Sequence, residues 1–232
     1  SLATMPQHPL LQAPRVRMAD SLSPDSAEIC EKLLKGFAPP TMNLFPSFIP
    51  DSGRRLPVPK RDVARAKALL EEAGWKGAGV RSKDGTPLKL ELVISEDAVA
   101  GSRALGEVIQ NFVREAGIDV DLRLVDHVSR HDDIPQLKYD LALFITAGAP
   151  YDPHSSLTTY FLSTYRTGTD GKMFMDAAKL DPLVNAALTA TEGTRAAAYQ
   201  AFYDWLEQNH AIAPVYHATR LWAPGKRVPN FS

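Results

Sequence analysis

The chain has 232 residues, of which 44% are hydrophobic, and a formal net charge of −1. That length is enough for one large domain or two small ones with a buried core, and the near-neutral charge gives no electrostatic case for a nucleic-acid partner. The single cysteine, Cys30, excludes an internal disulfide and a cysteine-based zinc cluster, and no apolar run approaches the roughly 18 residues of a membrane span.

The first quarter of the chain contains one helical pattern between two extended ones. Residues 1–20 are proline-rich and irregular, which predicts an extended segment. Residues 23–37 predict a helix, because Ser23 can cap it, Pro24 suits the first helical position and apolar residues recur at helical spacing. Residues 38–59 carry six prolines, which predicts a second extended segment.

Helical and strand patterns then alternate. Residues 60–75 carry an apolar stripe of helical period, which Gly74 ends. Residues 88–95 and 118–126 alternate apolar and polar side chains, as half-buried strands do. A helical pattern over residues 102–117 separates these two strands. A helix between two strands is the repeating unit of an α/β layered fold.

The last part of the chain continues this pattern. Residues 137–147 contain a third strand that is apolar on both faces, so we expect it at the centre of the sheet. Residues 180–191 and 194–210 predict two more helices, and residues 212–224 predict a late strand pair or an extended tail. We predict an α/β fold with a mixed sheet flanked by helices, in one domain over residues 1–232.

The sequence offers weak candidates for metal binding. It contains no glycine-rich phosphate loop, no HExxH and no GxSxG motif. His127 and His131 are four residues apart and could hold a metal ion together on a helix. Their polar surroundings end at Pro135, which favours a solvated turn, and the adjacent Asp132 and Asp133 are interpreted as solvated charges. We therefore predict neither a metal site nor a cofactor.

The stretch GAPYDPHSSLTTY, residues 148–160, is the candidate ligand site. Asp152 precedes Pro153 and is expected to cap a helix whose first position is that proline. His154 would need an orienting partner and a nucleophile to act as a general base; the sequence shows neither, so we predict no enzyme. Because open α/β sheets bind ligands at the carboxyl ends of their strands, we expect Tyr151 to face a ligand with its ring and hydroxyl.

Five blocks of sequence, taken in order, resemble the family 5 solute-binding proteins of ABC importers. They are DVARAKALLEEAGWKG, KDGTPLKLELVIS, ALGEVIQNFVREAGIDVDLRLVD, YDLALFITAGAPYDPHSSL and APVYHATRLWAP. The resemblance runs from about Pro14 to Pro224, and the LLEEAGW helix followed by a DG turn is specific to the family. Members of this family bind dipeptides, oligopeptides, nickel chelates and related solutes.

The resemblance implies that this chain is the C-terminal lobe of a two-lobed, clam-like protein, with a type II periplasmic-binding-protein-like fold. The first lobe and a signal peptide are then expected outside this sequence, and the protein in the periplasm or elsewhere outside the cytoplasm. The two lobes would capture a small solute (nickel, a metal chelate or a peptide-like molecule) and deliver it to ABC permease subunits. One lobe alone is expected to bind solute weakly, because lobe closure supplies much of the affinity. The alternative is a stand-alone interaction module, derived from one lobe, that binds a protein partner.

Within the family, GAPYDPH is most similar to the nickel-importer branch. Peptide-binding members usually place an Asp three residues before the Asp of the Asp-Pro pair, and Ala149 stands at that position. Nickel-binding members carry a Trp where this chain has Ala147, and a His where an alignment without gaps places Tyr165. We expect Asp152 to be a structural cap, and the solute to be contacted by Tyr151, Ala147, Tyr165, His154 and Arg166, the last of which would supply charge to an anionic solute or chelator.

Overall fold

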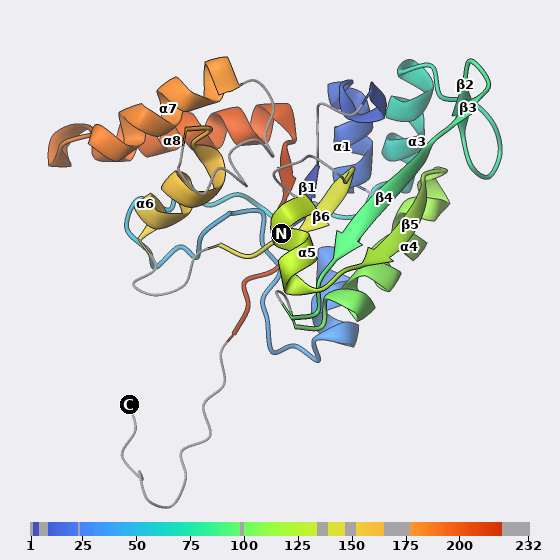
Figure 1. Ribbon diagram of the computed structural model, residues 1–232, viewed down its shortest axis with the longest axis horizontal. Helices are drawn as coiled ribbons and strands as arrows, with labels where there is room; N and C mark the ends of the chain where they lie inside the picture. The colour runs from blue at the N-terminus through green and yellow to red at the C-terminus, as the bar shows by residue number, and fades with distance from the viewer. Residues whose placement is uncertain are drawn as a thin grey trace, which may run out of the picture.

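The computed structural model describes residues 2–4, 9–22, 24–97, 100–133, 139–146, 152–164 and 177–219. Its centre is a five-stranded sheet of order β5-β4-β6-β1-β7 (Figure 1). β4 is parallel to β5 and β6, whereas β1 is antiparallel to β6 and β7, so the sheet is mixed, as predicted. The strands are β1 Leu2–Thr4, β4 Lys89–Ile94, β5 Asp119–Leu124, β6 Leu141–Leu143 and β7 Ile212–Ala213, with β2 Ser82–Lys83 and β3 Thr86–Pro87 in a separate hairpin.

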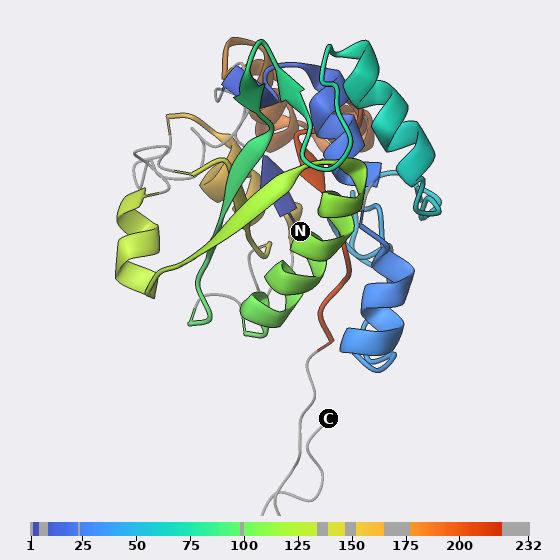
Figure 2. The same ribbon diagram turned by 90° about the vertical axis from the view of Figure 1, so that its right-hand side faces the viewer.

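Helices cover both faces of this sheet. One face carries α1, α3 and α4, and the other carries α6, η3, α7 and α8 (Figure 1). Figure 2 shows α4 lying beside β4 and β5, on which it packs. The bounds are η1 Pro9–Leu11, α1 Pro14–Leu22, α2 Ser26–Glu28, η2 Ile29–Leu33, α3 Val63–Glu72, α4 Ser102–Ala116, α5 His127–Asp133, α6 Pro153–Ser156, η3 Leu157–Phe161, α7 Ala177–Thr189 and α8 Glu192–Asn209.

The alternation of side chains along β4 explains why each face of the sheet has its own core. Leu92 and Ile94 pack into the core beneath α1, α3 and α4, and Val93 between them packs into the core beneath α7 and α8. β6 lies in the middle of the sheet, and all three of its residues are buried, two in the first core and one in the second. The prediction of a central strand within residues 137–147 is therefore confirmed.

The expectation of an extended segment over residues 1–20 is wrong, because α1 forms there and packs against α3. Pro14 is the first residue of α1, a position where its missing N–H costs nothing. Arg17, with only 1% of its surface exposed, donates hydrogen bonds to the carbonyl oxygens of Leu11 at 2.6 Å and Asn209 at 2.8 Å. These partners are distant in sequence or depend on the fold, so a local pattern does not reveal them.

The helix expected over residues 23–37 is shorter and starts later than predicted. The three-residue α2 is followed directly by η2, a π-helical turn that ends at Leu33. The N-cap is Asp25, whose carboxylate accepts a hydrogen bond from the N–H of Glu28 at 2.8 Å. Ser23, which was expected to be the cap, lies outside the described residues. Asp25, two residues after Ser23, therefore provides the N-cap hydrogen bond that was expected from the serine.

The polar stretch after β5 forms a helix, α5, where a solvated turn was expected. Asp126 begins it: its carboxylate accepts hydrogen bonds from the backbone N–H of Ser129 at 2.7 Å and from the Ser129 hydroxyl at 3.1 Å. Those two hydrogen bonds lower the pKa of Asp126. The capping aspartate supports a helix start in a stretch whose polar side chains and Pro135 favoured a solvated turn.

Candidate functional site

The carboxyl ends of β4, β5 and β6 lie along one edge of the sheet, because these strands are parallel; we call it the carboxyl edge. β1 runs in the opposite direction and begins at this edge, where Leu2 pairs with Leu143 of β6 and with Ala213 of β7. Large apolar side chains remain exposed beside these strand ends, namely Leu124, Val128 and Ile145. Open α/β sheets bind their ligands at such an edge, so we take it as the candidate site.

Only part of the expected site falls within the described residues. Four of its residues lie outside them: Ala147, Tyr151, Tyr165 and Arg166. The other two, Asp152 and His154, stand at the start of α6. His154 is exposed, and its backbone carbonyl accepts a hydrogen bond from the hydroxyl of Thr158 at 2.8 Å. The imidazole of His154 therefore faces solvent, while the backbone that carries it is held by a hydrogen bond.

Asp152 is the N-cap of α6. Its backbone is extended, its carboxylate accepts a hydrogen bond from the N–H of His154 at 2.7 Å, and Pro153 occupies the first helical position. The same carboxylate is 3.2 Å from Nη2 of Arg195, at the start of α8. It therefore satisfies a free helix N–H and pairs with a cation at the same time. The start of α6 is tied to the start of α8 through this one side chain.

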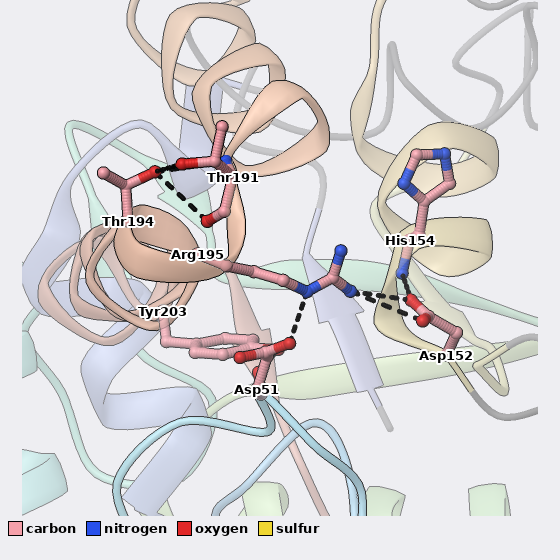
Figure 3. A network of polar contacts seen from close by, with 7 residues as sticks. All are labelled: Asp51, Asp152, His154, Thr191, Thr194, Arg195 and Tyr203. Atoms are coloured by element: carbon pink, nitrogen blue, oxygen red, sulfur yellow. Dashed lines mark hydrogen bonds and ion pairs between the residues drawn. The ribbon is translucent and has the colours of Figure 1, made fainter.

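Arg195 lies between two carboxylates (Figure 3). Its Nε forms an ion pair with Asp51, and its Nη2 reaches Asp152 on the other side. The guanidinium carbon also stands 4.8 Å from the ring centre of Tyr199, within the range of a cation–π contact. The hydrogen bond to Asp51 raises the pKa of Arg195, outweighing the opposite effect of burial. One cation is thus shared by a loop, a helix start and a buried aromatic ring.

Asp51 belongs to the predicted extended segment, residues 38–59, and this loop is held firmly against α8. The hydroxyl of Tyr203 donates a hydrogen bond to the carbonyl oxygen of Asp51 at 2.8 Å. Gly53 has a φ of +82°, and a Cβ built there would stand 2.5 Å from the Tyr203 ring, so only glycine allows this approach. Arg54 adds two solvent-exposed ion pairs, with Asp204 and Glu207 of α8.

Sequence reasoning missed Arg195, because Asp152 is 43 residues away and Asp51 is 144 residues away. The local sequence does locate the start of α8: Thr191 and Thr194 form a capping box there (Figure 3). A cation this close to a helix N-terminus opposes the helix dipole, and that is the one local hint that Arg195 needs acidic partners.

A groove of about 640 Å³ lies between the extended segment 38–59 and the residues that follow β7. Because β7 runs parallel to β6, residues 217–219 continue past the carboxyl edge. His217 lines the groove with its Nε2 at 3.0 Å from the carbonyl oxygen of Asn43, and burial lowers the pKa of this histidine. Phe48, on the opposite wall, is 81% exposed. The groove therefore borders the candidate site.

The described part of the chain contains no group of three or more His, Cys, Asp or Glu side chains that could hold a metal ion. His127, one of the two histidines considered as a metal pair, is exposed at the start of α5. The side chain of the other, His131, is outside what the structure describes. Among the described helices, none combines the length and the apolar character that a membrane span requires.

Comparison with known proteins gives matches along most of the chain. The family model described as bacterial extracellular solute-binding proteins, family 5 Middle, matches residues 2–168. The nickel-binding periplasmic protein of Escherichia coli (strain K12) is 28% identical over 211 residues, which are 89% of this chain and 40% of that protein. The chain thus spans about two fifths of the length of this curated relative.

Solved structures also match nearly the whole of this chain. An ABC transporter substrate-binding protein from Sinorhizobium meliloti matches with a TM-score of 0.86 and 46% identity, over 94% of this chain and 44% of that one. NikA from Brucella suis, solved in complex with Fe(III)-EDTA, matches with a TM-score of 0.82 and 29% identity, over 93% of this chain and 44% of that one. Each match covers nearly all of this chain and less than half of the other protein.

Proposed function

The chain belongs to the family 5 bacterial extracellular solute-binding proteins. We propose that residues 1–232 form one domain, the C-terminal lobe of the solute-binding component of an ABC importer. The complete protein would hold a small solute between two lobes outside the cytoplasm and deliver it to ABC permease subunits. The chain accounts for 40% to 44% of the length of similar proteins, a share that agrees with one lobe of two.

The observation that carries this proposal is the composition of the carboxyl edge. The start of β1 and the end of β7 lie at this edge, and the side chains of Leu124, Val128 and Ile145 remain exposed at the ends of β5 and β6 and in α5. An apolar edge with a few polar groups suits a small ligand. Closure of a second lobe over this edge would exclude water from the solute.

We propose a metal chelate, with nickel as the first candidate metal, as the solute. Tyr151, Tyr165 and Arg166 are the expected contacts, and a guanidinium with aromatic rings suits an anionic chelate better than a bare metal ion. Phenol oxygens are poor nickel ligands beside imidazole, so the chelator would supply most of the donor atoms. Ala149 stands where peptide-binding members carry an aspartate, which removes a partner for a peptide ammonium.

Calorimetric titration of the full-length protein tests this proposal. The solutes are nickel(II) with excess L-histidine, Fe(III)-EDTA, nickel(II) alone and a tripeptide. We expect micromolar or tighter binding of at least one chelate, and weaker or no binding of the bare ion and the peptide. Tight binding of the peptide without either chelate would move the protein to the peptide-binding branch. Binding of none of the four would contradict the proposed solute class.

A further inference from the structure

Arg195 connects the candidate site to the rigid part of the lobe, and we infer that it is a positioning residue for solute binding: it fixes the start of α6 by holding Asp152 against α8. The inference rests on the proposed function, because it concerns how the same edge of the sheet binds solute. It assigns no direct contact with solute to Arg195. The effect passes through the carboxylate of Asp152.

The geometry requires an arginine. Arg195 donates from Nε toward Asp51 and from Nη2 toward Asp152, so two edges of one planar group serve two segments. A lysine has a single nitrogen and cannot reproduce this arrangement. The guanidinium rests over Tyr199, which is fully buried, so the cation sits on a fixed platform. The orientation of the guanidinium therefore fixes where the Asp152 carboxylate lies.

Burial makes this pair more effective than a surface ion pair. The side chains of Arg195 and Asp51 are 27% and 17% exposed, whereas the Asp152 side chain is 50% exposed. Partly buried pairs are screened by salt less than exposed ones. The Asp51–Arg195 pair is thus the more strongly held part of the network, and it fixes the more exposed side chain of Asp152.

The base of the network is immobilised independently. Tyr203 bonds the carbonyl of Asp51, and the backbone N–H of Arg54 donates to the side-chain oxygen of Gln200 at 2.8 Å. Both contacts join the extended segment to α8 and neither touches α6. A displacement of the start of α6 away from α8 must therefore break the Arg195–Asp152 contact, while the loop beneath can stay in place.

Arg54 is a matched control for Arg195. It also bridges the extended segment and α8, and it also pairs with two carboxylates, those of Asp204 and Glu207. Its side chain is 51% exposed, and within the described residues its hydrogen bonds and ion pairs go to Asn43 and to α8, not to α6. Arg54→Met removes a comparable set of ion pairs from the same helix without altering the cap of α6.

The experiment compares four variants of the full-length protein: Arg195→Met, Asp152→Asn, their combination, and Arg54→Met. Asparagine is a good N-cap, so Asp152→Asn keeps the bond to the N–H of His154 and removes only the charge that Arg195 holds. Hydrogen exchange of the first turn of α6 is measured without solute. Affinity is then measured for nickel(II) with excess L-histidine, or for Fe(III)-EDTA if only that chelate binds the parent, and thermal melting is recorded for all variants.

We expect Arg195→Met and Asp152→Asn each to weaken chelate binding roughly five- to tenfold and to speed exchange in the first turn of α6. The double variant should be no weaker than the worse single variant, because both remove one contact. Arg54→Met should stay within about twofold of the parent in affinity and leave exchange in α6 unchanged, even if its melting temperature falls.

Three results would overturn the inference. Unchanged exchange and affinity in Arg195→Met, with a lower melting temperature, would make Arg195 a purely structural residue. Additive losses in the double variant would mean that Arg195 acts independently of Asp152. Equal losses in Arg54→Met would remove the specific role. If the parent binds no chelate, the proposed solute is wrong, and the exchange measurement alone decides whether Arg195 holds α6.

Discussion

Two arginines hold the two ends of α8, and they do so in different ways. Arg17 is buried and donates to the carbonyl oxygen of Asn209, the last residue of the helix, and to that of Leu11. Arg195 stands at the start of the same helix and pairs with the carboxylates of Asp51 and Asp152. One end of α8 is fastened through backbone atoms and the other through charged side chains.

The helix dipole accounts for the difference. A cation is favourable at the C-terminal end of a helix, so Arg17 can act there through carbonyl oxygens. At the N-terminal end a cation is unfavourable, and Arg195 needs two acidic partners to offset it. Burial lowers the pKa of Arg17 to about 10, whereas the hydrogen bond to Asp51 raises the pKa of Arg195. Arg17 therefore serves the fold, while Arg195 joins the fold to the candidate site.

Arg17→Met should have the largest effect on stability, and it tests whether Arg17 holds the C-terminal end of α8 in the fold. The substitution removes the donor to the buried carbonyl oxygen of Leu11 and to the partly buried one of Asn209, and we expect a loss of about 3 kcal/mol in the free energy of unfolding. Urea unfolding of the full-length protein measures it. Arg15→Met is the control on the same helix: Arg15 is exposed and pairs with Glu72, so its loss should cost less than about 0.5 kcal/mol. Equal losses in the two variants would refute the structural role of Arg17.

Asp152→Ala should lower both stability and chelate affinity, whereas Tyr151→Ala should lower chelate affinity alone. Loss of the cap and of the contact with Arg195 should cost about 1–2 kcal/mol of stability in Asp152→Ala. Tyr151→Ala should weaken chelate binding with little change in melting, because we propose that its ring faces the solute. Thermal melting and titration of the full-length variants test both. If Asp152→Ala melts like the parent and loses solute while Tyr151→Ala does the opposite, the two roles are reversed.

The sheet and the long helices could be predicted because their signals are local. The alternation of apolar and polar side chains predicts β4 and β5. The continuous apolar run predicts β6 and its place at the centre of the sheet, and the structure has all three strands there. α1 could not be predicted, since its stability depends on contacts of Arg17 with segments as far away as Asn209. α5 was missed because its signal is a single capping residue, Asp126.

In the candidate site, too, the features with a local signal could be predicted and those that depend on packing could not. The pair Asp152–Pro153 is a local signal for a helix start, and the structure has Asp152 at that position. The contact of Asp152 with Arg195 depends on how α6 and α8 pack, and no pattern within either segment specifies it. The roles of Tyr151, Ala147, Tyr165, His154 and Arg166 in solute binding stay predictions, because they depend on the solute and the second lobe as well as on this chain.

The smallest expected effect is a pH dependence at the C-terminal end of α8. His210 is the C-cap, with a left-handed φ of 47°, and burial and the nearby charge of Arg17 lower its pKa below the ordinary 6.5, against a smaller opposing effect of Glu207. Between the lowered pKa and 6.5 the unfolded chain binds more protons than the folded one, so stability falls as the pH decreases through this window.

His210→Asn removes the titration and tolerates the left-handed conformation. We expect the melting temperature of the variant to fall less than that of the parent between about pH 7.5 and about pH 5.5. His217, whose pKa burial also lowers, titrates in both proteins and cancels in the difference. An equal or larger fall in the variant would mean that burial and the charge of Arg17 do not disfavour protonation of His210 at this end of α8.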